Sequence, residues 1–144
     1  MEKTQTYKNH GRVVPTYHIG VLGIFFVNFC WHIYRATYDM SGESIMGFFM
    51  SIAFLLLFFT VRGMVLRVQD RLIRLEMRLR LRELLPQDLQ SKIPQLTLDQ
   101  LIGLRFASDA ELVSLVRECA AGQLTSRKEI KMKVKDWQGD YLRA

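Results

Sequence analysis

The hydrophobic positions of this chain are concentrated in two uninterrupted apolar runs in its first half. Residues 17–34 and residues 44–61 each comprise 18 residues without an Asp, Glu, Lys or Arg. At 1.5 Å rise per residue, each run forms a helix of about 27 Å, close to the ~30 Å hydrocarbon core of a bilayer. Because only residues 35–43 separate the runs, the pattern predicts a transmembrane helical hairpin.

A cleaved secretory signal peptide is the alternative interpretation of the first run. Its apolar stretch exceeds the usual length of about 7–15 residues, and Trp31, His32 and Tyr34 stand where a small-residue cleavage site is needed. Tyr17 at one end and Trp31 and Tyr34 at the other are typical of membrane interfaces. We therefore interpret residues 17–61 as a retained hairpin.

Helical periodicity continues past the second run through residues 62–85, which we call the stalk. The stalk contains one Gly and no Pro, so the helix should continue to Pro86. Five apolar residues follow the alternating spacing of three and four that is typical of coiled coils; this stalk stripe comprises Val65, Val68, Leu72, Leu75 and Leu79. We expect the stripe to pack against the tail or against a second subunit. A second apolar face comprises Leu66, Ile73, Met77, Leu81 and Leu84.

The remaining residues, 86–144, have the composition of a small helical tail. Thr97, Ser108 and Ser126 are each followed three positions later by Gln or Glu, which is the capping-box signature of a helix start. A short helix is expected between Pro86 and Pro94. A last helix is predicted from the spacing of Ile130, Val134, Trp137 and Tyr141. The predicted fold is an all-α membrane protein with a hairpin, a stalk and a helical tail.

Charged residues are distributed unevenly, and this asymmetry predicts the topology. The chain has a formal net charge of +6. Basic residues flank the outer ends of the hairpin, in the N-tail of residues 1–16 and in the stalk, whereas residues 35–43 have a net charge of −1. By the positive-inside rule, both termini are cytoplasmic and the connector lies on the opposite side.

Seven arginines against three acidic residues give the stalk a net charge of +4. Arg62, Arg67 and Arg71 are nearest the predicted membrane and should contact anionic lipid head groups, each worth roughly 1 kcal/mol near such a surface. Nucleic-acid binding favours aromatic residues that stack on bases, and residues 61–105 contain none. We therefore expect the lipid bilayer and its anionic lipids as partners, and no nucleic acid.

Small and polar residues within the apolar runs predict close helix packing. Gly47 and Ser51 form a small-xxx-small pair that lets two helix backbones approach. We favour packing of this pair against the first run, where Gly20 and Gly23 are also small, over an oligomer contact. Asn28 is the most deeply placed polar side chain of the first run, and we expect it to hydrogen-bond to the second run.

His18 and His32 are the candidate cofactor ligands. Fourteen positions separate them, so they share a helix face about 21 Å apart. This arrangement would suit haem or metal ligands near the two membrane surfaces, but no other apolar run supplies partner histidines. We favour two interfacial residues with hydrated polar tips, and expect no cofactor and no metal.

The sequence contains no recognisable catalytic motif. It lacks G-x-S-x-G, H-E-x-x-H, C-x-x-C and a phosphate-binding glycine loop. Cys30 lies in the first apolar run and Cys119 in the tail, so no disulfide is expected. We predict that the protein is not an enzyme.

Several segments resemble a bacterial family of two-span membrane proteins of unknown function. The similar segments are residues 5–10, 67–71, 80–86, 104–112 and 130–142, together with Arg12, Pro15, Tyr17 and His18. The resemblance implies a bacterial inner-membrane protein, and it supplies no activity, ligand or catalytic residue.

These observations leave two main hypotheses for function. The first is a non-catalytic membrane module that assembles with itself, or docks to a larger membrane complex, through its cytoplasmic helices. The second is a small homo-oligomeric channel whose pore would be lined by Asn28, Ser51 and Thr60, by analogy of layout alone. A haem- or metal-binding membrane subunit is a minor alternative.

Overall fold

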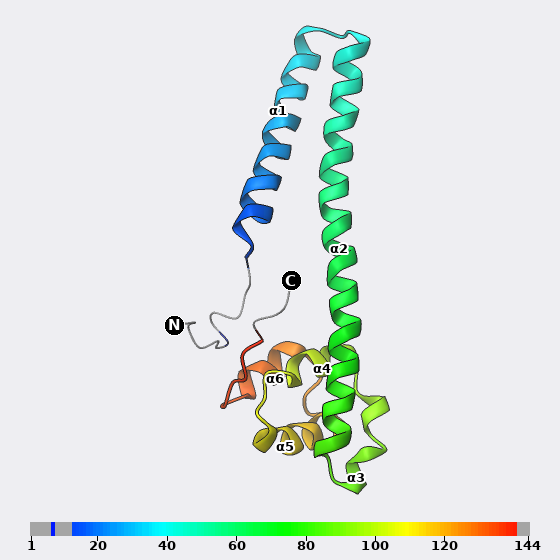
Figure 1. The fold of residues 1–144 in the computed structure, drawn as a ribbon, viewed down its shortest axis with the longest axis vertical. Coiled ribbons are helices and arrows are strands. Elements are labelled where there is room, and N and C mark those ends of the chain that lie inside the picture. Colours follow the sequence, from blue (N-terminus) through cyan, green and yellow to red (C-terminus); the bar gives the residue numbers. More distant parts are fainter. Residues whose placement is uncertain (1–6, 8–12, 141–144) are drawn as a thin grey trace. The chain divides into compact units, whose positions relative to one another are not determined.

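The structure is a computed structural model that describes Tyr7 and residues 13–140. Every regular element of these residues is a helix (Figure 1). The described residues group into two units, 13–66 and 67–140, and the boundary between them falls inside one long helix, α2 (Gly42–Leu84). The expectation that the second apolar run continues as a helix to Pro86 is therefore confirmed.

The first unit is a helical hairpin. A π-helical turn, η1 (Thr16–Val21), follows Pro15 and leads directly into α1 (Leu22–Tyr38), which lies beside the first part of α2 (Figure 1). The non-helical connector comprises only residues 39–41, which is shorter than the predicted 35–43. Helix α1 continues through Arg35 because no helix breaker intervenes, and Arg35 forms an i,i+4 ion pair with Asp39 at 3.6 Å.

Aromatic rings join the two helices of the hairpin. Three stacked pairs have centroids 4.2, 5.3 and 5.9 Å apart: Tyr17 with Phe58, Phe25 with Phe54, and Phe29 with Phe48. The Tyr17 hydroxyl also donates a 2.7 Å hydrogen bond to the Phe58 carbonyl. Offset stacking adds about 0.5–1.5 kcal/mol per pair beyond the area that it buries. These pairs therefore fix the register of α1 against α2.

Both hairpin helices are long and apolar enough to span a membrane. The candidate spans are Thr16–Tyr38 and Gly42–Leu84. No residue in the most apolar window of the first is buried, and only 17% of the corresponding window of the second is buried. The core helix of a soluble protein would instead bury its apolar side chains. Here most of them face outwards, including Ile24, Val27 and Leu56, each more than 60% exposed.

The second unit is a helical tail that folds onto the end of α2. It contains α3 (Gln87–Gln90), η2 (Ile93–Gln95), α4 (Leu98–Leu104), α5 (Asp109–Ala120) and α6 (Arg127–Lys133). Its largest fully buried apolar side chains are those of Leu81, Leu101, Leu104, Phe106, Leu112, Val116 and Ile130. The Gln90 side-chain amide donates to the carbonyls of Arg82 and Leu85, which satisfies the end of α2 just before Pro86.

Two of the three predicted capping boxes are present. Thr97 caps α4 together with Gln100, and Ser126 caps α6 together with Glu129. Ser108 does precede α5, but its side chain forms no capping bond. The expected reciprocal partner, Glu111, instead accepts hydrogen bonds from the backbone N–H groups that follow Val134. The prediction of a box at Ser108 is therefore wrong, because a distant segment competes for the Glu111 carboxylate.

The predicted final helix ends earlier than expected. Helix α6 stops at Lys133, Val134 is extended, and Trp137 forms an antiparallel bridge with Ala107. Two backbone hydrogen bonds hold this segment, from Ser108 to the Asp136 carbonyl and from Gln138 to the Phe106 carbonyl. The helical spacing reflects burial of Ile130 and Val134 on one surface, and the last member of the pattern, Tyr141, lies outside the described residues.

One close helix approach in the tail requires a glycine. A Cβ built on Gly103 would lie 2.9 Å from the Cβ of Ile130, so α4 and α6 meet at a distance that only glycine permits. Gly122, two residues after the end of α5, has a φ of 75° and terminates that helix in the left-handed region.

Candidate functional site

The stalk presents two apolar faces, and the tail covers only one of them. Ile73, Met77 and Leu81, which we call the buried face, are at most 5% exposed and belong to the same core as the tail helices. They recur every four residues along α2, so they form one row on the helix. The tail therefore has no core that is independent of α2.

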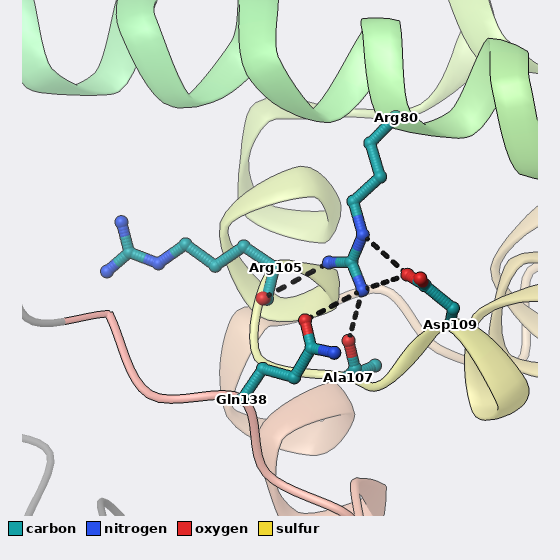
Figure 2. A network of polar contacts seen from close by, with 5 residues as sticks. All are labelled: Arg80, Arg105, Ala107, Asp109 and Gln138. Carbon is teal, nitrogen blue, oxygen red and sulfur yellow. Dashed lines mark hydrogen bonds and ion pairs between the residues drawn. The ribbon is translucent and has the colours of Figure 1, made fainter.

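Arg80 adds a polar anchor beside the buried face (Figure 2). Its Nε and one terminal nitrogen donate to the Asp109 carboxylate at 2.9 and 2.6 Å. The same terminal nitrogen donates to the Ala107 carbonyl at 2.8 Å and to the Gln138 side chain at 3.0 Å. The other terminal nitrogen reaches the Arg105 carbonyl at 3.5 Å. One guanidinium thus joins the stalk to the start of α5 and to the C-terminal segment.

The role of Arg80 was missed by sequence reasoning, although a signal was present. Arg80 follows Met77 by three positions and precedes Leu84 by four, so it lies on the apolar face of the stalk rather than among the other arginines. A lone charge on such a face must find partners when the face is covered. In the structure its side chain is only 23% exposed.

The stalk stripe is the uncovered face. Its five residues, Val65, Val68, Leu72, Leu75 and Leu79, are between 42% and 67% exposed. Of the two roles expected for them, packing against the tail is wrong for the described residues, because the buried face carries that contact. Contact with a second subunit or another partner stays a prediction.

The predicted lipid-contacting arginines lie on the same helix. Arg67 and Arg71 are exposed and Arg62 is half-buried. Their interaction with anionic head groups stays a prediction.

Gly47 packs against the first helix, which is the contact that we favoured from the sequence. A Cβ on Gly47 would lie 2.5 Å from Nδ1 of His32, so the imidazole occupies space that only glycine leaves. Ser51 is fully buried and donates to the Phe48 carbonyl at 2.7 Å. The packing that Gly47 provides is therefore specific to one ring on α1.

The two histidines have local roles in the hairpin. His18 Nδ1 lies 3.1 Å from the Val14 amide nitrogen and 3.0 Å from the Val14 carbonyl, one turn earlier. His32 is wedged against Gly47, as described above. Within residues 13–140 and Tyr7, no cluster of three or more His, Cys, Asp or Glu side chains could hold a metal ion.

The positions of Asn28, Gly20 and Gly23 relative to α2 differ most from what we expected. A Cβ on either glycine would meet no atom within 4 Å, so neither glycine packs against α2. Together with Asn28 they line a groove of about 620 Å³ formed by residues of η1 and α1. The expected hydrogen bond from Asn28 to α2 is absent from the described residues, because Asn28 faces this groove and Ser51 bonds to its own helix.

Cys119 and Glu129 have shifted pKa values, and neither resembles a catalytic residue. Burial, with a smaller effect from Glu118, raises the pKa of the Cys119 thiol to about 11. Backbone N–H groups of Ser126 and Thr125 lower the pKa of Glu129, which is the capping interaction of α6. Cys119 is thus held as an inert neutral thiol, and Glu129 as a capping carboxylate.

Comparisons with known proteins place the chain in a family without an assigned role. A search of the curated proteins and a search of the solved structures found no match. The model of one family, DUF6526, matches residues 1–144. The chain therefore belongs to DUF6526, a family of unknown function.

Proposed function

We propose that the protein is a non-catalytic integral membrane protein of the bacterial inner membrane. In this proposal the hairpin anchors the chain with both termini in the cytoplasm. The cytoplasmic helices then assemble with a second copy or dock to a larger membrane complex.

The exposed apolar surface of the hairpin supports membrane insertion. Soluble monomers rarely expose a contiguous apolar patch of more than a few hundred Å². Large side chains such as Ile19 on η1, Ile24 and Val27 on α1, and Leu56 and Phe59 on α2 are all more than 60% exposed. A hydrocarbon environment is the solvent in which this surface is stable. The stacked aromatic pairs between α1 and α2 further support a retained first helix.

The single observation that carries the assembly proposal is the uncovered stalk stripe. Burying a Leu or Val fully contributes roughly 1.5–3 kcal/mol, and these five residues still expose about half of their surface. Their alternating spacing of three and four places them along one seam, which is the geometry of a coiled-coil contact. Arginines beside the seam keep the remaining surface soluble.

Crosslinking of the full chain in native membranes tests the proposal. Leu72→Asp with Leu75→Asp should abolish the adducts that are crosslinked through the cytoplasmic helices, while the tail stays protease-resistant, because the tail uses the buried face. Arg71→Gln with Arg74→Gln lowers the net charge of the stalk by the same amount as the two aspartates do, but outside the stripe. It should leave the adducts unchanged. Mass spectrometry of the adducts separates self-assembly from docking to another protein. Adducts through the cytoplasmic helices that survive the Leu72/Leu75 double substitution would contradict a role for the stripe.

A further inference from the structure

The outer face of α1 carries a groove that no part of the described chain fills. Its lining residues all come from η1 and α1: Ile19, Gly20, Gly23, Ile24, Val27, Asn28 and Trp31. Every member therefore lies within one helical segment, and the groove exists because Gly20 and Gly23 have no side chains. Backbone is exposed at these two positions, with open space where a Cβ would be.

Asn28 gives this groove a polar group that lacks a partner. Its amide carries two donors and one acceptor oxygen. Among the described residues it makes no hydrogen bond, although it lies near the middle of the first apolar run. Hydrocarbon offers no water to replace the missing partner, so an amide in this position is stabilised by contact with another helix.

We propose that a second copy of this chain occupies the groove, through a parallel contact between the two α1 helices. The inference rests on the membrane insertion proposed above and identifies one partner and one surface for self-assembly. Both copies have the same topology in a membrane, so equivalent residues lie at equal depth around a two-fold axis. The groove of one copy therefore faces the equivalent groove of the other copy.

The spacing of the groove residues makes this face complementary to itself. Gly20, Ile24, Val27 and Trp31 follow the spacing 4-3-4 and form the seam of a left-handed helix pair. Gly23 and Asn28 then occupy the two flanks of the seam, five positions apart. In a parallel pair, flanking positions with this offset lie beside each other across the interface. Asn28 of each copy thus reaches the bare backbone at Gly23 of the other, and the contact occurs twice.

Disulfide crosslinking in native membranes tests the contact in the full chain. The background is Cys30→Ser, with Cys119 retained because it is buried in the tail. Ile24→Cys lies on the seam, whereas Phe26→Cys is similarly exposed but lies outside the groove. We expect a homodimeric adduct from Ile24→Cys under mild oxidation and none from Phe26→Cys. Equal adducts at both positions, or an adduct with a different protein, would overturn the proposal.

A second measurement probes the amide itself. The dimer dissociation constant of the full chain in mild detergent, measured by energy transfer, should rise about tenfold for Asn28→Leu, because two interhelical hydrogen bonds are lost. An unchanged or lower constant would contradict the assigned role of Asn28.

The stalk stripe gives the control that separates the two interfaces. In the Leu72→Asp, Leu75→Asp background, the Ile24→Cys adduct should persist even though assembly through the stripe fails. Loss of the adduct in that background would assign dimerisation to the stalk and overturn the α1 contact. Recovery of the chain in the soluble fraction would overturn membrane insertion, and this inference with it.

Discussion

The guanidinium of Arg80 points into the tail (Figure 2). Replacing it with Ala removes the bonds to Asp109 and Gln138 and leaves the carbonyl of Ala107 without this donor. Charged hydrogen bonds contribute about 1.5–3 kcal/mol each, so the tail should lose about 2–3 kcal/mol of stability. Urea unfolding of a fragment that comprises residues 67–144 measures this loss.

Arg82 is the matched control for Arg80, because it lies on the same helix and its side chain is exposed. Arg82→Ala should change the unfolding free energy by less than about 0.5 kcal/mol, as is usual for surface positions. Equal effects of the two substitutions would refute the anchoring role of Arg80.

The raised pKa of the Cys119 thiol predicts that the stability of the tail depends on pH. Burial raises the pKa of its thiol from 9.0 to about 11. The neutral form is therefore favoured by folding, so this contribution is complete below pH 9 and is lost as the pH rises from 9 to about 11. Native protein should resist thiol reagents at pH 7 and should react after unfolding. Rapid modification of the native protein at pH 7 would show that the thiol is accessible.

Residue roles were predictable where one signal dominates, and were missed where partners come from distant segments. The small size of Gly47 predicted close helix packing, and the structure shows that its neighbour is His32. The amide of Asn28 predicted a polar contact, but the sequence could not specify which side of α1 faces α2. That choice depends on the aromatic pairs, whose two partners are separated by about twenty residues or more.

At the scale of elements, the stalk concentrates charge next to the end of the predicted span. In a fragment comprising residues 62–144, Arg67→Glu with Arg71→Glu should weaken binding to anionic vesicles at least about 30-fold, since each basic residue contributes roughly 1 kcal/mol. The comparison uses co-sedimentation with vesicles at fixed salt, because screening changes the result.

Arg82→Glu serves as the control for vesicle binding, because it reverses a charge at the far end of the stalk. It should reduce binding much less than the double substitution. Equal binding of all variants, or binding to neutral vesicles alone, would exclude electrostatic contact with head groups.

Helix starts were more predictable than the last helix end. A capping box is encoded within four residues, so Thr97 and Ser126 could be identified without tertiary information. The end of α6 depends on backbone bonds to Phe106 and Ser108, more than twenty residues away. Similarly, the periodicity of α2 revealed two apolar faces, whereas only the folded tail determines which face is buried.

The whole molecule has a predicted orientation that can be measured. Cysteines placed one at a time at Met40 and Gln123, in the Cys30→Ser background that retains the buried Cys119, should label oppositely with an impermeant thiol reagent in intact cells. Met40→Cys should react, because Met40 is 78% exposed in the connector, which the predicted topology places outside. Gln123→Cys should react only after the membrane is permeabilised. The reverse labelling pattern would contradict cytoplasmic termini.

The boundary between the two units falls within α2 and not at Pro86, where the composition changes. This position limits how the gene can be divided or recombined. A fusion that joins the coding sequence at Pro86 would transfer the tail helices without Ile73, Met77, Leu81 and Arg80, and the recipient would gain an exposed apolar surface. An exchange upstream of residue 67 carries the complete core. The tail can therefore be inherited or transplanted only with the second half of the helix that precedes it.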